Sequence, residues 1–478
     1  MSIQQATKLL GEEVVNKAVF KELKNMMRFK TFSGVIPNQN VNKGNIVPSK
    51  LFLKLKTTGE LKARLVAGGH RQAETIYERQ SSPTVSFTTV LIVGMEASRQ
   101  EWTTASIDVP SAYLQAKRDE KLAPVFMILA PTVSQVLISH YPDMKVFVRN
   151  DGSMLVQIDG GIYGLIESSN IWNKEVKSHL INVHKLKQSK IDPCLFIGDE
   201  LLVALYVDDL LVVGTKEKVD LFYSGLCTRY GKCKINQGTQ VPFLRMMFDW
   251  ITPGSLKVSM DMPKVVLEIN KAVESPAGLN LFAENNDSPR LDENDSQWFY
   301  STVAKLLYIC SRCRPDAMLP VNYLCSRVGV STKSDMVKLH RVLKYLNGAQ
   351  KYALNVSMQV DDGCVVVATY IDASYATHID MKSHSGVVIS VGAGAVLAKS
   401  SKQRCVSKSS TEAELIAVSD YIAEGFVVSA LVKEGSNGSH QTCFVSRQFV
   451  HDGNYSKWES CRSIQACKGT RQLVEREG

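Results

Sequence analysis

Residues 201–214 read LLVALYVDDLLVVG, an apolar stretch that is interrupted near its centre by Asp208 and Asp209. Two apolar runs around a short polar break predict two strands joined by a tight turn. Neighbouring carboxylates between buried strands repel each other and lose hydration unless a cation neutralises them. The stretch therefore predicts a cation site at a hairpin tip, and a solvated Asp-Asp turn is the alternative. Two acids at its centre also exclude a membrane span.

A third acid lies at the end of a separate apolar segment. Residues 104–109 predict a strand that ends near Asp108, far upstream of the acidic doublet. Carboxylates on two neighbouring strands can share the ions of a two-metal site for phosphoryl transfer. The sequence leaves open whether the three acids meet, and a metal-free structural protein is the alternative.

A basic hairpin is predicted upstream of these acids. Residues 51–69 alternate in polarity on both sides of a turn at Thr57–Glu60, and the second half reads KARLVAGG. Lys62 and Arg64 on this hairpin would suit phosphate groups, and a solvated hairpin face is the alternative. Residues 89–98 predict a helix after the hairpin.

Composition places the chain among globular proteins that can bind polyanions. The 478 residues are too many for one hydrophobic core, and they predict roughly two to four domains. The 45% hydrophobic and 22% charged residues exclude a disordered or collagen-like chain. A net charge of +9 permits a nucleic-acid partner without requiring one. The amino terminus lacks the basic and apolar regions of a signal peptide, so we expect no export.

The cysteines do not form a disulfide framework. Their number, 11, is odd, and none occurs before Cys194, so a reducing compartment is expected. Cys310 and Cys313 form a CxxC pair without a second pair at zinc-site spacing. We interpret them as core thiols on a helix.

The second half of the chain predicts helices followed by a separate α/β domain. Residues 280–297 are polar and acidic, and they predict an interdomain linker. Residues 299–346 have helical periodicity, with Gly348 as a stop. From Cys364 the chain predicts short β-branched strands and then a helix over Thr411–Val432.

Taken together, these segments resemble the reverse transcriptase of copia-type retrotransposons. Six landmarks occur in the order of that family over residues 47–214, and their shared order makes the resemblance specific. The landmarks are Val47–Lys54, Lys62–Ala67 (KARLVA), Ser82–Val85 (SPTV), Ile107–Val109 with Ala112–Leu114, Ile162–Leu165 (IYGL) leading to Trp172, and Tyr206–Asp209 (YVDD).

The resemblance implies an α/β (α+β) fold with the fingers, palm and thumb of a right-hand polymerase. Fingers and palm would occupy residues 1–250, and a largely helical thumb or connection would occupy residues 251–350. A ribonuclease H-like α/β domain would follow at residues 351–434, and a divergent tail at residues 435–478. The chain resembles only the carboxyl-terminal third of a copia-type polyprotein, so we expect a fragment.

The resemblance also implies an RNA-directed DNA polymerase with two Mg²⁺ ions. Asp108, Asp208 and Asp209 would hold the metals in the palm, where one ion activates the primer 3′-hydroxyl and the other holds the triphosphate. Lys62 and Arg64 would grip the incoming nucleotide in the fingers.

Four further positions bear on the same site. Tyr113 matches the family aromatic that packs under the sugar and excludes a 2′-hydroxyl, and a core aromatic is the alternative. Arg245 lies in the primer-grip segment where relatives have Gly, which predicts a strained turn. Gly69 stands where many relatives have Lys. Glu167 replaces a common Gln, and a carboxylate there is unfavourable unless another cation offsets it.

The carboxyl-terminal domain resembles the ribonuclease H of the same family. Asp372 and Glu414 would help to bind divalent metals that activate water against an RNA strand. Glu412 is the neighbour most easily confused with Glu414, which we choose because Ala413–Leu415 matches the family segment best. The matching segments are Tyr370–Ala373, Lys382–Gly386, Gly394–Val396, Lys399–Gln403 and Ser409–Leu415.

The tail lacks the Asp-Asn-x-Ser motif of the family. Residues 447–453 can be encoded by CGACAATTTGTCCACGATGGA, which spells DNLSTM when it is read one base later. We therefore predict a frameshift between Glu434 and Arg447, with out-of-frame sequence after it. If the genomic codons do not spell the motif, Asp452 becomes the third ribonuclease H acid.

The expected partners are an RNA template, a DNA primer or RNA–DNA hybrid, and deoxynucleoside triphosphates, held mainly through phosphates. The family implies a cytoplasmic, particle-associated or nuclear location and no membrane. The strongest alternative is a decayed or domesticated relative that binds nucleic acid without turnover.

Overall fold

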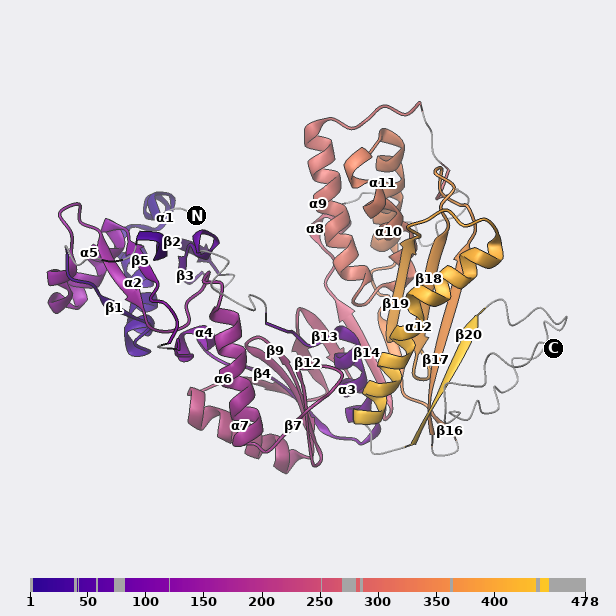
Figure 1. Ribbon diagram of the computed structural model, residues 1–478, viewed down its shortest axis with the longest axis horizontal. Helices are drawn as coiled ribbons and strands as arrows, with labels where there is room; N and C mark the ends of the chain where they lie inside the picture. Colours follow the sequence, from indigo (N-terminus) through magenta and orange to yellow (C-terminus); the bar gives the residue numbers. More distant parts are fainter. Residues whose placement is uncertain are drawn as a thin grey trace.

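In the part of the chain that the structure describes, four β-sheets and their helices extend from the amino-terminal to the carboxyl-terminal part of the molecule (Figure 1). The structure is a computed structural model, and it describes residues 3–37, 41, 43–56, 59–72, 82–119, 121–250, 252–268, 281–283, 287–361, 364–435 and 439–446.

The amino-terminal unit combines two helices with a five-stranded sheet. Helices α1 (Ile3–Leu10) and α2 (Glu12–Arg28) are separated at Gly11, whose φ of 85° ends the first helix. The predicted hairpin is confirmed, because β2 (Ile46–Leu55) pairs antiparallel with β3 (Leu61–Ala67). The sheet order is β1-β6-β5-β2-β3. The other strands are β1 (Phe32–Gly34), β5 (Phe126–Leu129) and β6 (Met154–Ile158). Helix α5 (Pro131–His140) packs against α2.

The central sheet has six strands in the order β11-β4-β10-β9-β8-β7, and every pair is antiparallel. The strands predicted on both sides of the acidic doublet and before Asp108 are confirmed to within two residues. Their apolar residues are buried on both faces, which explains the nearly continuous apolar runs in the sequence. The strands are β4 (Thr103–Asp108), β7 (Lys187–Gln188), β8 (Leu195–Gly198), β9 (Leu201–Tyr206), β10 (Asp209–Gly214) and β11 (Lys234–Gln237).

Helix α3 (Phe87–Arg99) confirms the helix predicted at residues 89–98. Its N-cap Ser86 accepts a hydrogen bond from the Thr89 N–H, which satisfies one of the free donors of the first turn. Every residue of α3 from Thr89 to Ser98 is buried, because the helix lies between the central sheet and the long carboxyl-terminal helix. The remaining helices of this part are α4 (Ala112–Gln115), α6 (Ser168–Asn182) and α7 (Lys216–Tyr230).

A four-stranded antiparallel sheet runs across the domain boundaries that we expect near residues 250 and 350. Strand β14 (Ser255–Met260) pairs with β13 (Met246–Asp249) on one side and with β15 (Leu354–Ser357) on the other. Strand β12 (Gln240–Phe243) completes the order β12-β13-β14-β15. Leu256 and Leu354 of this sheet belong to the same buried core as the central sheet, so these parts of the chain pack as one body.

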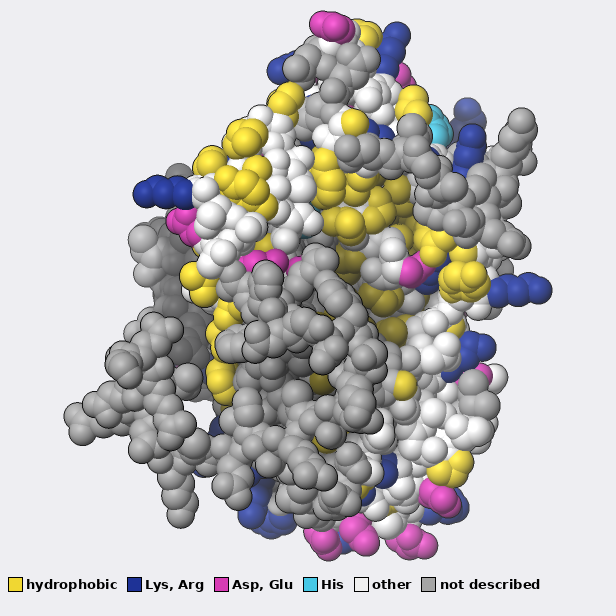
Figure 2. Space-filling view, turned by 90° about the vertical axis from the view of Figure 1, so that its right-hand side faces the viewer, with side chains coloured by type: hydrophobic (Ala, Val, Ile, Leu, Met, Phe, Trp, Pro, Cys, Tyr) yellow, Lys and Arg dark blue, Asp and Glu magenta, His cyan; other side chains and the backbone are white. Residues whose placement is uncertain are grey.

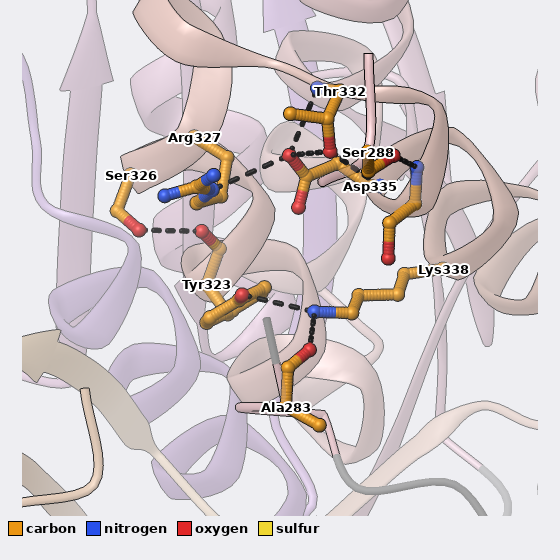
Figure 3. Close-up of polar contacts among 9 residues, drawn as sticks. Ala283, Ser288, Tyr323, Ser326, Arg327, Thr332, Asp335 and Lys338 are labelled. Atoms are coloured by element: carbon orange, nitrogen blue, oxygen red, sulfur yellow. Dashed lines mark hydrogen bonds and ion pairs between the residues drawn. The ribbon is translucent and has the colours of Figure 1, made fainter. Parts of the chain in front are cut away.

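The helical segment predicted at residues 299–346 is confirmed as three helices, and the last ends at Gly348 as predicted. Cys310 and Cys313 are 1% and 2% exposed, so both are core thiols as predicted, but only Cys310 lies on a helix and Cys313 lies in the turn that follows it. Arg327 pairs with Asp335 at 3.3 Å, and Asp335 also forms a capping box with Thr332 (Figure 3). The helices are α9 (Glu293–Cys310), α10 (Met318–Arg327) and α11 (Lys333–Gly348), with the short α8 (Lys264–Leu267) against α11.

The linker prediction is wrong over residues 293–297, which form the first turn of α9. Asp292 caps this helix by accepting a hydrogen bond from the Asp295 N–H, so the acidic composition marks a helix start. Upstream, the Lys338 ammonium donates to the Ala283 carbonyl at 2.7 Å, and it also donates to a tyrosine hydroxyl of α10 (Figure 3). The described part of the segment is therefore docked on the helices.

The carboxyl-terminal unit confirms the predicted strands and long helix. Helix α12 (Ser410–Gly435) packs against β17, β18 and α3, and among the described helices it alone has the length and composition of a membrane span. Figure 2 views the molecule from this side and shows apolar side chains at the surface; Val388 and Phe426 are among the exposed apolar residues of the unit. The strands are β16 (Val360–Asp361), β17 (Cys364–Ser374), β18 (His384–Ser390), β19 (Leu397–Lys402) and β20 (Ser439–Ser446), which pairs parallel with β17.

Candidate active site

Two adjacent strands bring the three predicted palm acids to one pocket. β4 and β10 pair antiparallel, and Asp108 lies directly opposite Asp209 in their register. Opposite residues of an antiparallel pair project to the same face of the sheet. Asp208 belongs to the turn that leads into β10. The pocket has a volume of about 280 Å³, and its walls include the three acids, Ser106, Lys234, Asn236, Phe243, Leu244 and Arg245.

The three carboxylates share this pocket without forming a closed ligand cluster. In the described part of the chain, no group of three or more His, Cys, Asp or Glu side chains is gathered tightly enough to hold a metal as it stands. Burial raises the pKa of Asp209 to about 6, and the charges of Asp208 and Asp108 add to the effect. Burial also raises the pKa of Asp208, with a contribution from Asp108. The ionised acids are therefore poorly solvated and repel one another.

The donor set fits a hard divalent cation such as Mg²⁺. Carboxylate oxygens are the protein ligands that this ion prefers. A cation between the acids would offset both the burial and the mutual repulsion that raise their pKa values. Asp108, Asp208 and Asp209 are the residues that could hold it.

The basic hairpin faces these acids. β3 exposes Lys62 and Arg64, whose positions alternate with buried apolar residues along the strand. Burial lowers the pKa of Lys62 and the Arg64 charge adds to this, whereas the charge of Asp108 opposes it. The charge of Arg64 in turn acts on Asp208. The structure therefore brings the two predicted phosphate-binding residues within electrostatic range of the acids.

Tyr113 connects the hairpin to the acids through a second tyrosine. The rings of Tyr113 and Tyr163 meet edge to face with centroids 5.3 Å apart. The Arg64 guanidinium lies 4.5 Å from the centroid of the Tyr163 ring, a cation–π contact. Burial raises the pKa of Tyr113, and the charge of Asp208 adds to the shift. Arg64, Tyr163 and Tyr113 thus form a continuous wall that leads from the hairpin to Asp208.

Close backbone contacts seat the hairpin on the IYGL segment. The Ala67 N–H donates to the Tyr163 carbonyl at 2.8 Å, and the Gly69 N–H donates to the Gly164 carbonyl at 3.1 Å. Gly164 has a φ of 91°, and a Cβ on Gly69 would lie 2.1 Å from the Gly164 carbonyl oxygen. In this chain, Gly69 is therefore required by the close approach of the two backbone segments.

The carboxylate of Glu167 is offset by a buried cation, as the sequence analysis requires. Arg118 Nε lies 3.0 Å from Glu167 Oε1, and both side chains are 5% exposed. Gln72 Nε2 donates to Glu167 Oε2 at 3.1 Å, and Gln72 Oε1 accepts from the Ile166 N–H at the same distance. Glu167 is thus part of a buried network that joins the end of the hairpin segment to the IYGL loop.

The turn between β12 and β13 forms the opposite wall of the pocket. Leu244 and Arg245 have φ values of 50° and 65°, so the strain predicted at Arg245 is confirmed. Two consecutive residues with positive φ are typical of a hairpin turn that normally contains Asn and Gly. Lys234 is not among the predicted site residues; it lies opposite Asp108 in the β4–β11 register and lines the pocket with Arg245. Local patterns gave no signal for this long-range pairing.

The predicted ribonuclease H acids lie on two packed elements of the carboxyl-terminal unit. Asp372 is exposed near the end of β17, and it alternates with Ile371 and Ala373, which pack in the core with Ala417 of α12. Glu414 is 8% exposed and lies on the stripe of α12 that packs inward. The two acids thus lie on elements that pack against each other, and their shared metal site stays a prediction.

Glu412, the alternative to Glu414, accepts a hydrogen bond from the Lys408 N–H at the start of α12. It is exposed and serves the first turn of this helix. The inward position of Glu414 agrees with the choice made from the sequence. The predicted frameshift and Asp452 lie outside the described residues.

Comparisons with known proteins agree with this geometry. Residues 37–223 match the family described as "Reverse transcriptase (RNA-dependent DNA polymerase)". The chain is 23% identical over 447 residues to the transposon Ty1-NL2 Gag-Pol polyprotein of Saccharomyces cerevisiae, and 22% identical over 446 residues to its Ty1-DR6 counterpart. Each alignment covers 87% of this chain and 24% of the relative. The resemblance to copia-type retrotransposon polyproteins is thereby confirmed.

Proposed function

We propose that this chain, a reverse transcriptase segment of the copia-type retrotransposon family, is an RNA-directed DNA polymerase. The observation that carries the proposal is the register of Asp108 opposite Asp209, with Asp208 in the adjoining turn and the Lys62–Arg64 hairpin in electrostatic range. A pocket of carboxylates next to fixed cations suits a substrate that arrives as a metal-bound triphosphate.

The acidic residues of the site would bind metal, and the basic residues would bind phosphate. Asp108, Asp208 and Asp209 would hold two Mg²⁺ ions, which when bound activate the primer 3′-hydroxyl and offset the charge of the triphosphate. Lys62 and Arg64 would bind phosphate oxygens of the incoming nucleotide. Because these positive charges are present before substrate binds, they would attract the triphosphate ahead of the phosphoryl-transfer step.

Tyr113 would set the sugar specificity. Its ring is half-buried and held edge to face by Tyr163, so it forms a fixed surface rather than a mobile side chain. A rigid aromatic wall beside Asp208 would leave room for a deoxyribose and not for a 2′-hydroxyl. Tyr113→Ala should therefore let the chain incorporate ribonucleotides, which is measured by extension with ATP in place of dATP.

Primer extension on an RNA template with Mg²⁺ tests the polymerase. Asp208→Asn should abolish extension, because it removes one metal-binding charge. Asp220→Asn is the matched control, since Asp220 is a half-exposed acid on α7 that pairs with Lys216. If the folded wild-type chain binds a labelled RNA–DNA hybrid and never extends it, the chain is a nucleic-acid binder without turnover.

We also propose a ribonuclease H activity in the carboxyl-terminal unit. The sheet supports this proposal, because β20 pairs parallel with β17, and β17, β18 and β19 form an antiparallel ladder. Helix α12 packs on this sheet and carries the buried Glu414. Asp372 and Glu414 would contribute to the metal site.

Cleavage of the RNA strand in a labelled hybrid tests this second activity. Asp372→Asn and Glu414→Gln should each abolish cleavage, whereas Glu412→Gln should retain it. Equal loss in all three variants, or no cleavage by the wild type, would refute the assignment without affecting the polymerase.

The partners follow from these activities. We infer that the chain binds an RNA template, a DNA primer and deoxynucleoside triphosphates, and that it acts in the cytoplasm as part of a larger polyprotein. Its basic excess of +9 favours binding through phosphates, which predicts affinity that falls steeply with salt.

A further inference from the structure

The turn that carries Asp208 has an unfavourable backbone. Tyr206 pairs with Asp209, so Val207 and Asp208 are the two central residues between β9 and β10. Val207 has a φ of 58°. A β-branched side chain strongly disfavours this left-handed region, and glycine is the residue that normally occupies it in such a turn. The surrounding structure must therefore hold Val207 in place.

Two hydrogen bonds from outside the hairpin hold this turn. The indole N–H of Trp172 donates to the Val207 carbonyl at 2.6 Å. The Val109 N–H, one residue after Asp108, donates to the Asp208 carbonyl at 2.9 Å. The peptide groups on both sides of Asp208 are therefore fixed, one to the strand that carries Asp108 and the other to an indole.

Trp172 is itself immobilised. It lies on α6, its side chain is 1% exposed, and it meets the ring of Tyr230 edge to face with centroids 5.4 Å apart. Tyr230 belongs to α7, which packs against β4 and β10. The indole ring thus packs against the helix that supports the two acid-bearing strands.

We propose that Trp172 is a positioning residue for the metal site, and that its indole N–H holds the Val207 peptide so that Asp208 and Asp209 face Asp108. The inference rests on the proposed function, because it concerns the same three acids. Trp172 has a positioning role and not a catalytic one, because its indole N–H bonds the Val207 carbonyl and not a carboxylate. It acts by keeping the acids together against their own repulsion.

Loss of the donor has a defined physical effect. The Val207 carbonyl would lose its indole partner, and Val207 could relax toward negative φ. This relaxation rotates the peptide that leads into Asp208 and moves its carboxylate away from the other two. Without a cation, repulsion between the acids favours this movement, and the hydrogen bond from the Val109 N–H to the Asp208 carbonyl is left to oppose it.

The experiment removes the donor and keeps the ring. Trp172 is replaced by 3-benzothienylalanine, which has sulfur in place of the indole N–H, and in a second variant by Phe. Trp250 is the matched control, because its indole N–H donates to the Gly94 carbonyl at 2.9 Å in a part of the core away from the acids. The same two replacements are made there.

Three measurements are made on the full chain. Binding of Mn²⁺ without substrate is followed by electron paramagnetic resonance, backbone hydrogen exchange is measured for residues 203–212, and primer extension gives kcat and KM. The loss of one hydrogen bond predicts a Mn²⁺ dissociation constant that is about threefold to tenfold higher in the Trp172 variants. We expect faster exchange at the turn and a lower kcat at unchanged KM for template–primer. The Trp250 variants should match the wild type.

Equal Mn²⁺ affinity and equal turn exchange in the Trp172 and Trp250 variants would overturn the proposal. If the Phe variant fails to fold by circular dichroism, the benzothienyl variant decides, because it preserves the packed volume. Val207→Gly is an independent test, because glycine removes the backbone strain at this position. Combined with the Trp172 variants, it should restore part of the Mn²⁺ affinity. If it restores none, the proposed mechanism is wrong. Weaker Mn²⁺ binding in a chain that never extends a primer would support the positioning role while refuting the polymerase.

Discussion

Glu167→Gln should destabilise the chain. The Glu167 carboxylate lies 3.0 Å from Arg118, and each side chain is only 5% exposed. Removal of one partner leaves a buried charge uncompensated, which costs about 3–5 kcal/mol. We expect the lower end, because Arg118 also donates to the Ala123 carbonyl at 2.6 Å and keeps that bond. A loss of about 3 kcal/mol lowers the melting midpoint of a unit of this size by roughly 6–12 °C.

Thermal unfolding at pH 7, followed by circular dichroism, measures this change. Glu175→Gln is the control, because the Arg229–Glu175 pair is partly exposed and such pairs contribute about 1 kcal/mol or less. Arg118→Met combined with Glu167→Gln should recover most of the loss, since the unpaired charge is gone. A Glu167→Gln chain that melts within 1–2 °C of the control would refute the argument from the buried pair.

The remaining predictions concern backbone strain and two groups of titratable side chains. Arg245→Gly should stabilise the chain by about 1 kcal/mol by relieving a positive φ, measured by urea unfolding; Arg245→Ala keeps the strain and should not. The folded pKa of Asp209, about 6, exceeds the ordinary 3.8, so its stabilising contribution is full below pH 4 and is lost as pH rises through 6. Without metal, Asp209→Asn should therefore raise the melting midpoint more at pH 7.5 than at pH 4.5, and equal gains would contradict this. Burial lowers the pKa of His378 and His384 to about 4. Their contribution to folding stability is therefore present above pH 6.5 and is lost as pH falls toward 4. Hydrogen exchange in β18 should become faster over that pH range, and the increase should be smaller in His384→Asn.

Local patterns predict the strands around the three acids because each strand has a strong periodicity. The alternation around Lys62 and Arg64 gave the hairpin, and the apolar runs around Asp208 gave two buried strands. Carboxylates at strand ends gave the candidate metal site. These features depend on neighbours in the sequence, which is why one chain sufficed to find them.

The features that were missed depend on contacts between distant segments. Lys234 faces Asp108 only because β11 pairs with β4, and Arg118 offsets Glu167 only because a loop folds back on the IYGL segment. At residues 293–297 composition does not separate a linker from a helix start, because acidic residues are common both in linkers and in the first turn of a helix. The hydrogen bond from the Asp295 N–H to the Asp292 side chain shows that these residues begin a helix, and this bond exists only in the folded chain.

The sheet formed by β12, β13, β14 and β15 has a practical consequence for dissecting the protein. Its outer strand, β15, ends at Ser357, beyond the helices and within the segment that leads to the carboxyl-terminal unit. A recombinant fragment that stops at residue 350 would leave the edge of β14 unpaired, and unpaired edges favour aggregation. The shortest soluble truncation should therefore end after Ser357.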